Sequence, residues 1–332
     1  MIKSHLKHGV AIILSIAAIA INVSAMAQTY PNKPVSLLVP YPPGGLSDVI
    51  ARMVSQPLSQ ELGQTVIVEN LGGASGSIAA QKLLNSPADG YTIFQGSPNE
   101  LILAPLAIKA IKFKSEDFKP VAMIGEAQMA MFGRKGLPVN TLDEFVAYVK
   151  KKAAEGKPVT YASVGIGSFY HLLGEQLSKT IGADMMHVPY KGGAPANQAL
   201  IGDQVDIFIT PFGKNYEELS EKGMIKLLGV LNKTRTPELN KYPVSGESVA
   251  LKDFAFTIWT GYFVKNDTPK EVVDKIHLSL NKILSDPKLV EGLKANSLLV
   301  PKPTSLEELA KQYQQGIEQF RTIAKSINLQ PE

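Results

Sequence analysis

The sequence contains no cysteine among its 332 residues. This absence excludes disulfide bonds, thiolate metal sites and cysteine nucleophiles together. A chain of this length does not depend on disulfides, because a large hydrophobic core can carry its stability. The length also exceeds the size at which a single core usually stops growing, about 250 to 300 residues, and therefore favours two domains.

Motifs of common catalytic and nucleotide sites are missing as well. No G-x-S-x-G nucleophile elbow occurs. The glycine-rich turn at 72–77 has neither the Gly-Lys-Ser/Thr ending of a P-loop nor the spacing of a dinucleotide fold. Beyond residue 27 the histidines are His171, His187 and His277, at no metal-ligand spacing. We therefore expect no catalytic residue, no metal and no cofactor.

Long apolar runs are confined to the N-terminus. Lys3 and Lys7 precede an apolar run at 10–23, and Ala25-Met26-Ala27 has the small-x-small form of a signal peptidase site. We expect residues 1–27 to be a secretory signal peptide that is cleaved near Ala27, leaving a soluble, exported protein. An uncleaved membrane anchor is the alternative, but the run is shorter than the about 20 residues that cross a bilayer. The formal net charge of +4 is too small to indicate a nucleic-acid partner.

From residue 34 to about residue 125, short β-branched runs alternate with segments of helical periodicity. This alternation is typical of a βαβαβ unit with a parallel sheet. Because crossover connections are right-handed, both strand-to-helix turns are expected at the same edge of the sheet. The expected strands are 35–39, 65–68 and 91–95, and the expected helices are 47–62 and 75–85.

A second unit of similar build starts near residue 136. Thr141, followed three residues later by Glu144, predicts a capping box at its first helix. The expected strands are 159–162, 185–188, 205–209 and 226–230, and the expected helices are 141–154, 170–181, 195–201 and 215–222.

The pattern changes after residue 254. A β run at 256–264 is followed by amphipathic helices that have no sheet of their own and are expected to pack on the first unit. The runs 122–132 and 256–264 would then cross between the units as a hinge. We predict an α/β fold of two lobes, each a mainly parallel sheet flanked by helices. Lobe 1 comprises residues 28–125 plus 254–332, and lobe 2 comprises residues 126–253.

Two turns lead from a strand through small residues into a helix, at 39–48 and at 159–175. A helix start offers free N–H groups and the positive end of the helix dipole, which attract a carboxylate or phosphate without a lysine. One such turn alone can serve chain reversal only. Two of them, about a domain apart, predict a cleft with an anion-binding turn on each wall. Ser168 is placed to cap its helix or to face the ligand.

Asp48 places a negative charge in the first helical turn of the predicted helix 47–62, beside the expected anion site. Asp48 is expected to be stabilised by the helix dipole, to pair with Arg52 and to face away from the ligand. Ser47 and the N–H groups of Gly45 and Leu46 remain in the predicted ligand shell.

The chain resembles the Bug-type, TctC-like solute receptors of tripartite tricarboxylate transporters. The resemblance covers essentially the whole mature chain, whereas each motif by itself is weakly specific. The residues that carry it are Tyr30-Pro31-Asn32-Lys33-Pro34-Val35, 39–48 with Ala51-Arg52, Val68-Glu69-Asn70, Gly72-Gly73-Ala74-Ser75-Gly76, 87–92, Tyr161-Ala162-Ser163, Gly165, Gly167-Ser168, His171-Leu172 and 187–193.

The resemblance implies a periplasmic protein of two-lobed periplasmic-binding-protein architecture. Such a receptor closes on a small organic acid and delivers it to its cognate membrane permease subunits, and we expect it to be a monomer. Family members hold a ligand carboxylate chiefly with backbone groups and hydroxyls of the two loops, often with ordered water. The predicted ligand-binding residues are Tyr41, Gly44, Gly45, Leu46, Ser47, Gly73, Ala74, Ser97, Asn99, Ser163, Gly165, Gly167, Ser168, Phe169, His171, Thr210 and Phe212.

Several of these assignments have open alternatives. The expected ligand is a dicarboxylate or an aromatic carboxylate such as a phthalate type. The aromatic choice follows from Phe169, Tyr170, Phe212 and Trp259, which put more aromatic surface near the expected cleft than receptors for small aliphatic acids suggest. The same rings are equally explained by hinge and core packing.

His171 is placed either to donate to the ligand or to satisfy a backbone carbonyl. A periplasmic enzyme or a sensor-coupled binding protein acting on an organic acid is the alternative function.

Overall fold

The structure is a computed structural model that describes residues 30–236, 239–296, 298–326, 329 and 331. The predicted signal peptide, residues 1–27, lies outside the described residues. Among the described helices, none combines the length and the apolar character that a bilayer crossing requires.

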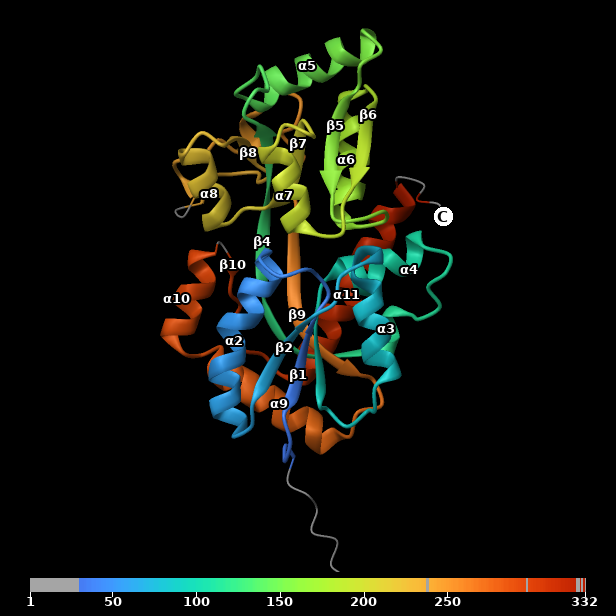
Figure 1. The fold of residues 1–332 in the computed structure, drawn as a ribbon, viewed down its shortest axis with the longest axis vertical. Coiled ribbons are helices and arrows are strands. Elements are labelled where there is room, and N and C mark those ends of the chain that lie inside the picture. Colours follow the sequence, from blue (N-terminus) through green and yellow to red (C-terminus); the bar gives the residue numbers. More distant parts are fainter. Residues whose placement is uncertain (1–29, 237–238, 297, 327–328, 330, 332) are drawn as a thin grey trace, which may run out of the picture.

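The chain has an α/β fold of two lobes, which lie one above the other in Figure 1. The strands are β1 (Val35–Val39), β2 (Val66–Asn70), β3 (Thr92–Gly96), β4 (Phe118–Arg134), β5 (Val159–Ser163), β6 (Met185–Pro189), β7 (Ile207–Pro211), β8 (Ile225–Val230), β9 (Thr257–Lys265) and β10 (Leu298–Leu299). The α-helices are α2 (Leu46–Leu62), α3 (Ser77–Asn85), α4 (Ala104–Ala107), α5 (Leu142–Ala154), α6 (Phe169–Ile181), α7 (Gly193–Ile201), α8 (Lys214–Glu221), α9 (Lys270–Ile283), α10 (Pro287–Ala295) and α11 (Leu306–Ser326). Short helical turns are η1 (Ala74–Gly76), η2 (Asn99–Leu103), η3 (Ser115–Asp117) and η5 (Ser245–Glu247).

The lower lobe contains the predicted βαβαβ unit. β1 lies between β2 and β3 and is parallel to both, with α2 and α3 as the crossover helices. Val35, Leu37, Leu38 and Val39 are all fully buried, because a parallel strand in a doubly covered sheet faces apolar side chains on both sides. The strand-to-helix turn at 40–45 therefore lies at the carboxyl end of β1.

The upper lobe repeats this build with β5 parallel to both β6 and β7. Thr141 caps α5 as predicted, since its Oγ1 accepts a hydrogen bond of 3.2 Å from the Glu144 N–H. The Glu144 carboxylate accepts from the Asn140 N–H at 2.7 Å, one residue earlier than a capping box requires.

The two lobes share the long strand β4, which is continuous between them (Figure 1). Its part from Phe118 to Gln128 pairs antiparallel with β9, and its part from Met129 to Gly133 pairs with β7. The described strands thus form one sheet in the order β2-β1-β3-β9-β4-β7-β5-β6, with β8 and β10 also paired to β4. The return crossing lies where β9 begins, and there the Phe256 N–H donates to Leu231 O at 2.9 Å.

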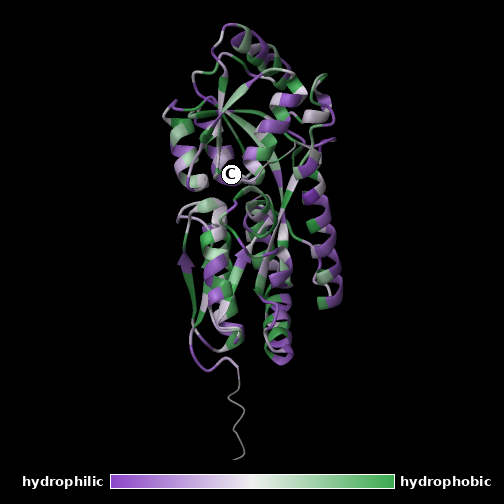
Figure 2. Cartoon of the chain, turned by 90° about the vertical axis from the view of Figure 1, so that its right-hand side faces the viewer, coloured by the Kyte–Doolittle hydropathy of each residue, from purple (hydrophilic) through white to green (hydrophobic). Residues whose placement is uncertain are grey.

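The C-terminal helices return to the lower lobe, as the sequence predicted. α9 and α10 pack against α2, and α11 packs against β4 and η2. In Figure 2 the helices carry green and purple residues side by side, as expected for amphipathic helices that cover a sheet with one face. The buried face of α11 consists of Leu309, Tyr313, Ile317, Phe320 and Ala324.

Candidate ligand-binding site

A cavity lies where the two lobes meet, and residues of both lobes line it. The space in it that a water molecule can occupy is about 70 Å³, which excludes a polymer. Of the predicted ligand-binding residues, those in the cavity wall are Tyr41, Gly44, Gly45, Leu46, Ser47, Ser97, Asn99 and Thr210.

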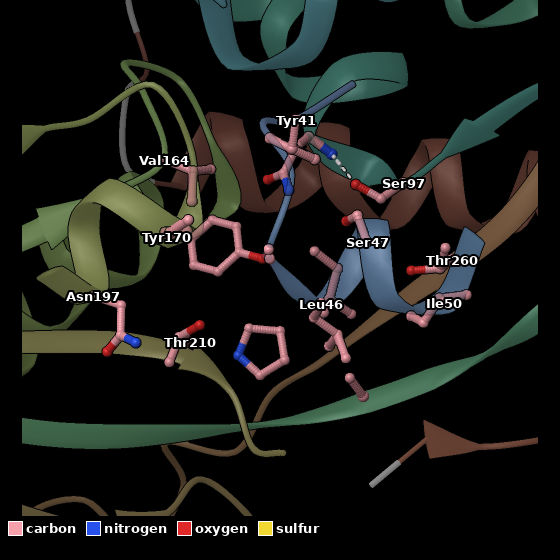
Figure 3. A pocket seen from close by; sticks show the side chains of 18 of the residues that line it. Tyr41, Leu46, Ser47, Ile50, Ser97, Val164, Tyr170, Asn197, Thr210 and Thr260 are labelled. Atoms are coloured by element: carbon pink, nitrogen blue, oxygen red, sulfur yellow. Dashed lines mark hydrogen bonds between the residues drawn. The ribbon is translucent and has the colours of Figure 1, made fainter. Parts of the chain in front are cut away.

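Figure 3 shows how the walls are composed. Leu46, Ser47 and Thr260 lie on one side of the cavity, and Tyr170, Asn197 and Thr210 lie on the other. The lining contains hydroxyl and amide groups beside apolar side chains. Within the described parts of the chain, no Lys, Arg, Asp or Glu side chain belongs to it.

Two helices direct their N-termini at this uncharged cavity, one from each lobe. α2 begins at Leu46 after Gly45, and α7 begins at Gly193 after Gly192; neither helix has a side-chain cap. In the described structure, the N–H groups of Leu46 and Ser47 in α2 and of Gly193 and Ala194 in α7 donate to no hydrogen-bond acceptor. These N–H groups and the two helix dipoles make the cavity attractive to an anion at both ends.

Asp48 and Arg52 pair behind the cavity wall, as the sequence predicted. The Arg52 Nε–H and the Gly44 N–H each donate to Asp48 Oδ2 at 3.0 Å. Burial raises the pKa of Asp48, but the hydrogen bonds from Arg52 and Gly44 outweigh it and lower the pKa below its usual value. The Gly44 N–H is therefore occupied, whereas the N–H groups that follow it are free for a ligand.

The tyrosines of the wall act as hydrogen-bond donors at neutral pH. Burial raises the pKa of Tyr216 to about 12 and raises the pKa values of Tyr41 and Tyr170 as well. Their hydroxyl groups therefore keep their protons over the physiological range. Tyr41 OH donates its proton to Glu100 Oε2 at 3.0 Å, whereas a ligand carboxylate is a suitable acceptor for the hydroxyl groups of Tyr170 and Tyr216.

The second predicted turn reaches the cavity only through Val164 and Tyr170, and its serine hydroxyl groups do not line it. Ser168 is fully buried, and its Oγ donates to Gly165 O at 2.7 Å and accepts from the His171 N–H at 3.3 Å. Ser163 is also fully buried, with its Oγ 2.6 Å from His187 Nε2. The hydroxyl groups of both serines are thus used to shape the turn. Ser168 therefore follows the capping alternative, because the cap takes up its side chain, and it does not belong to the cavity wall.

This turn instead packs against the lower lobe. The Ser75 hydroxyl donates to Ile166 O at 2.6 Å, and a Cβ on Gly167 would lie 2.0 Å from Ala107 Cβ. Gly165 and Ala74 line a separate hollow at the rim of the cleft. Gly73 precedes η1 with a φ of 125° and lies outside the cavity wall. The second predicted turn therefore forms a contact between the lobes.

Two of the predicted aromatic residues and His171 also lie outside the wall. Phe169 packs edge-on against Phe256 and Phe320, and Phe212 stacks on Phe132. Both therefore follow the core-packing alternative. The His171 ring stacks on His187 with centroids 3.9 Å apart, and its Nδ1 accepts from the Gly167 N–H at 3.1 Å.

The sequence prediction missed the part of the wall that α7 and its neighbours supply. The signal was present, because Gly192-Gly193 precedes a helix in the same way as Gly44-Gly45 does. Gly192 has a φ of 143°, and a Cβ there would come within 2.8 Å of Pro42 Cδ, so only glycine lets the two turns approach. The missed residues of the wall include Gly193, Ala194, Asn197, Asn215, Tyr216 and Thr260, whereas Tyr170 was expected near the cleft as an aromatic side chain.

Among the described residues, no group of His, Asp and Glu side chains is arranged to hold a metal ion. The site therefore has the donors of an anion-binding cavity and no recognisable reactive group.

Comparison with known proteins decides the family. A model of the tripartite tricarboxylate transporter family receptor, TctC, matches residues 50–329. The chain belongs to this family. The resemblance inferred from the sequence is thereby confirmed. The TctC family consists of solute-binding receptors, and the two-lobed α/β fold described above agrees with it.

Relatives and solved structures of the TctC family match over most of their length. Protein BugT of Bordetella pertussis is 32% identical, with 86% of each chain covered. The structure of the periplasmic binding protein BugD is 32% identical and superposes with a TM-score of 0.82, covering 91% of this chain and all of that one. MatC from Rhodopseudomonas palustris with bound malate is 27% identical with a TM-score of 0.81, covering 89% of this chain and 99% of its own. An R. palustris protein with adipate is also 27% identical, with a TM-score of 0.83 and coverage of 91% and 100%.

Proposed function

We propose that this protein is an extracytoplasmic receptor that binds a small organic carboxylate in the cavity between its lobes and delivers it to a membrane permease. One observation carries the proposal: α2 and α7 point their uncapped N-termini at one cavity from opposite lobes, in a wall without charged side chains. Helix N-termini hold anions with N–H groups and dipoles alone.

The ligand class is a dicarboxylate or an aromatic carboxylate of the phthalate type. A dianion can place one carboxylate at each helix start, and Tyr41, Tyr170 and Tyr216 provide aromatic surface for a ring between them. The malate and adipate bound to the two R. palustris structures are dicarboxylates, which supports the first choice. We assign the ligand contacts to the residues of the cavity wall that the sequence predicted and, in addition, to Gly193, Ala194 and Asn197. The predicted ones are Tyr41, Gly44, Gly45, Leu46, Ser47, Ser97, Asn99 and Thr210.

Binding closes the two lobes. A ligand that contacts both walls favours the closed arrangement by its difference in affinity for the two states. We assign residues 28–125 and 254–332 to lobe 1 and residues 126–253 to lobe 2. The support for these boundaries is that β4 exchanges its partner β9 for β7 between Gln128 and Met129.

The receptor works as a periplasmic monomer. Residues 1–27 serve as the signal peptide and are cleaved near Ala27, which leaves the two-lobed domain free to meet the permease. The receptor assignment is preferred to a periplasmic enzyme, because the cavity wall offers donors to an anion and no nucleophile paired with a base.

Titration calorimetry of the mature protein at pH 7 tests the proposal. The ligands are malate, adipate, phthalate and benzoate, with glucose and the diamine putrescine as controls that carry no carboxylate. At least one acid should bind with a low-micromolar Kd, which corresponds to about −8 kcal/mol. Recovery of that acid chemically unchanged after long incubation separates a receptor from an enzyme. Binding of glucose or putrescine without any acid would contradict the proposal.

A further inference from the structure

Glu100 is a carboxyl group buried directly behind the cavity wall. Its side chain is fully buried at the start of η2, and among the described residues no cation contributes to its electrostatic surroundings. Tyr41 OH donates to Glu100 Oε2 at 3.0 Å and Ser97 Oγ donates to the same oxygen at 3.1 Å, while the Ser97 N–H donates to Oε1. Tyr41 and Ser97 both line the cavity. Only one layer of side chains therefore separates this carboxyl group from the ligand space.

Other segments enclose Glu100 tightly. A Cβ on Gly76 would lie 3.1 Å from Glu100 Cβ and 3.3 Å from its Oε2, so the turn before α3 covers it from one side. The titratable groups that face it are the phenols of Tyr41, Tyr170 and Tyr313, from the turn after β1, from α6 and from α11. Burial raises the pKa values of all three, so they stay uncharged below pH 10. No cation is present among these groups to neutralise a Glu100 carboxylate.

We propose that Glu100 is a positioning residue that must be neutral when the cavity holds a carboxylate, so that ligand binding takes up a proton in alkaline solution. The inference rests on the proposed function, since it requires an anionic ligand. An ionised Glu100 and a bound carboxylate would be two like charges in one poorly solvated region, and such pairs repel strongly. The neutral acid keeps Tyr41 and Ser97 in place, with its own O–H donating to one of their two hydroxyl oxygens, and it does not oppose the ligand.

The pH range of the effect follows from the free protein. Burial raises the pKa of Glu100 to about 8, although hydrogen bonds from Tyr41 and Ser97 oppose the rise. Below pH 7 the carboxyl group is neutral with or without ligand, and binding takes up no proton. If only protein with a neutral Glu100 binds the ligand, the apparent Kd increases about tenfold between pH 7 and pH 9. The reason is that the fraction of protein with a neutral Glu100 falls about tenfold over the same range. The acids used as ligands are fully ionised throughout this range.

Calorimetry with the tightest binder among malate, adipate and phthalate tests the inference between pH 6.5 and pH 9.5. The wild-type Kd should rise above pH 8, and titration at pH 9 in two buffers of different ionisation enthalpy should show the uptake of close to one proton. Glu100→Gln, which is neutral at every pH, should abolish the slope whatever its Kd at pH 6.5. Glu291→Gln, on the exposed face of α10, should keep the wild-type slope.

A second variant shifts the pH dependence without removing it. Tyr41→Phe removes a hydrogen bond that favours the ionised carboxylate, so the pH at which affinity starts to fall should move upward. A wild-type Kd that is constant from pH 7 to pH 9.5, or proton uptake that is the same in Glu100→Gln, would overturn the inference while leaving the receptor function intact. Absence of binding at pH 7 would instead overturn the proposed function itself.

Discussion

The Phe169 N–H donates to Asn99 Oδ1 at 2.7 Å, and this hydrogen bond joins the two lobes. Asn99 is the first residue of η2 in the lower lobe and lines the cavity, whereas Phe169 opens α6 in the upper lobe. The acceptor satisfies one of the first N–H groups of α6, which lack an intrahelical partner. A residue of the cavity wall therefore also holds the lobes together.

Asn99→Ala is expected to weaken ligand binding. The variant leaves the buried Phe169 N–H without a partner when the lobes are in contact, at a cost of about 1–3 kcal/mol. Calorimetry with the tightest acid measures the loss. Asn281→Ala is the matched control, because it removes an amide that bonds Thr304 O far from the cleft. An equal loss of affinity in both variants would mean that Asn99→Ala weakens binding by lowering the stability of the fold, and not by removing the hydrogen bond between the lobes.

Gly45→Val and Gly193→Val should abolish binding while the protein stays folded. A Cβ on Gly45 would meet only Pro42 O at 4.0 Å, and a Cβ on Gly193 would meet nothing within 4 Å. The larger side chain therefore fits the fold but occupies the place where the helix start approaches the anion. Thermal unfolding checks the fold, and calorimetry checks binding. Retained affinity in Gly193→Val would exclude α7 as the second anion site.

Ser168→Ala should lower stability more than affinity. Loss of this cap costs about 1 kcal/mol, and Thr141→Ala, which removes the cap of α5 in the same lobe, should cost a similar amount. Urea unfolding of both variants measures the cost. A loss of affinity above tenfold in Ser168→Ala alone would restore the ligand contact that the sequence predicted.

Glu100 should make the protein less stable as the pH rises. Its pKa is higher in the folded state, about 8, than the ordinary value of 4.5, so the folded protein holds more protons between these values. Unfolding free energy attributable to Glu100 therefore falls with increasing pH across this window, by at most about 1.4 kcal/mol per pH unit. Urea unfolding at pH 5 and at pH 8.5 should show this fall in the wild type and a smaller fall in Glu100→Gln. Equal falls would contradict the raised pKa.

The local patterns of the sequence were sufficient for most of the fold. The strand at 35–39 agrees with its prediction, and α2 begins within one residue of the predicted start, because both follow from periodicity and from the glycines before the helix. The full length of β4 was not predicted. Its apolar run continues through both lobes, and sequence alone does not show where the strand changes partners.

The candidate site was predicted mainly on the wall of the lower lobe, and on the opposite wall only at Thr210. The turn at 44–47 lines the cavity as expected, whereas the turn at 165–168 packs on Ser75 and Ala107 of the other lobe. Which of two glycine-containing helix starts faces the cleft depends on how the lobes meet, and that is a long-range property. The burial of Glu100 could not be predicted from the sequence for the same reason, because three separate segments of the chain enclose it.

The structure of the protein with its tightest dicarboxylate tests the central claim most directly. A crystal structure should show one carboxylate hydrogen-bonded to the N–H groups of Leu46 and Ser47 and the other to those of Gly193 and Ala194, with no lysine or arginine in contact. A ligand bound elsewhere, or a carboxylate paired with a basic side chain, would contradict the two-helix account of this cavity.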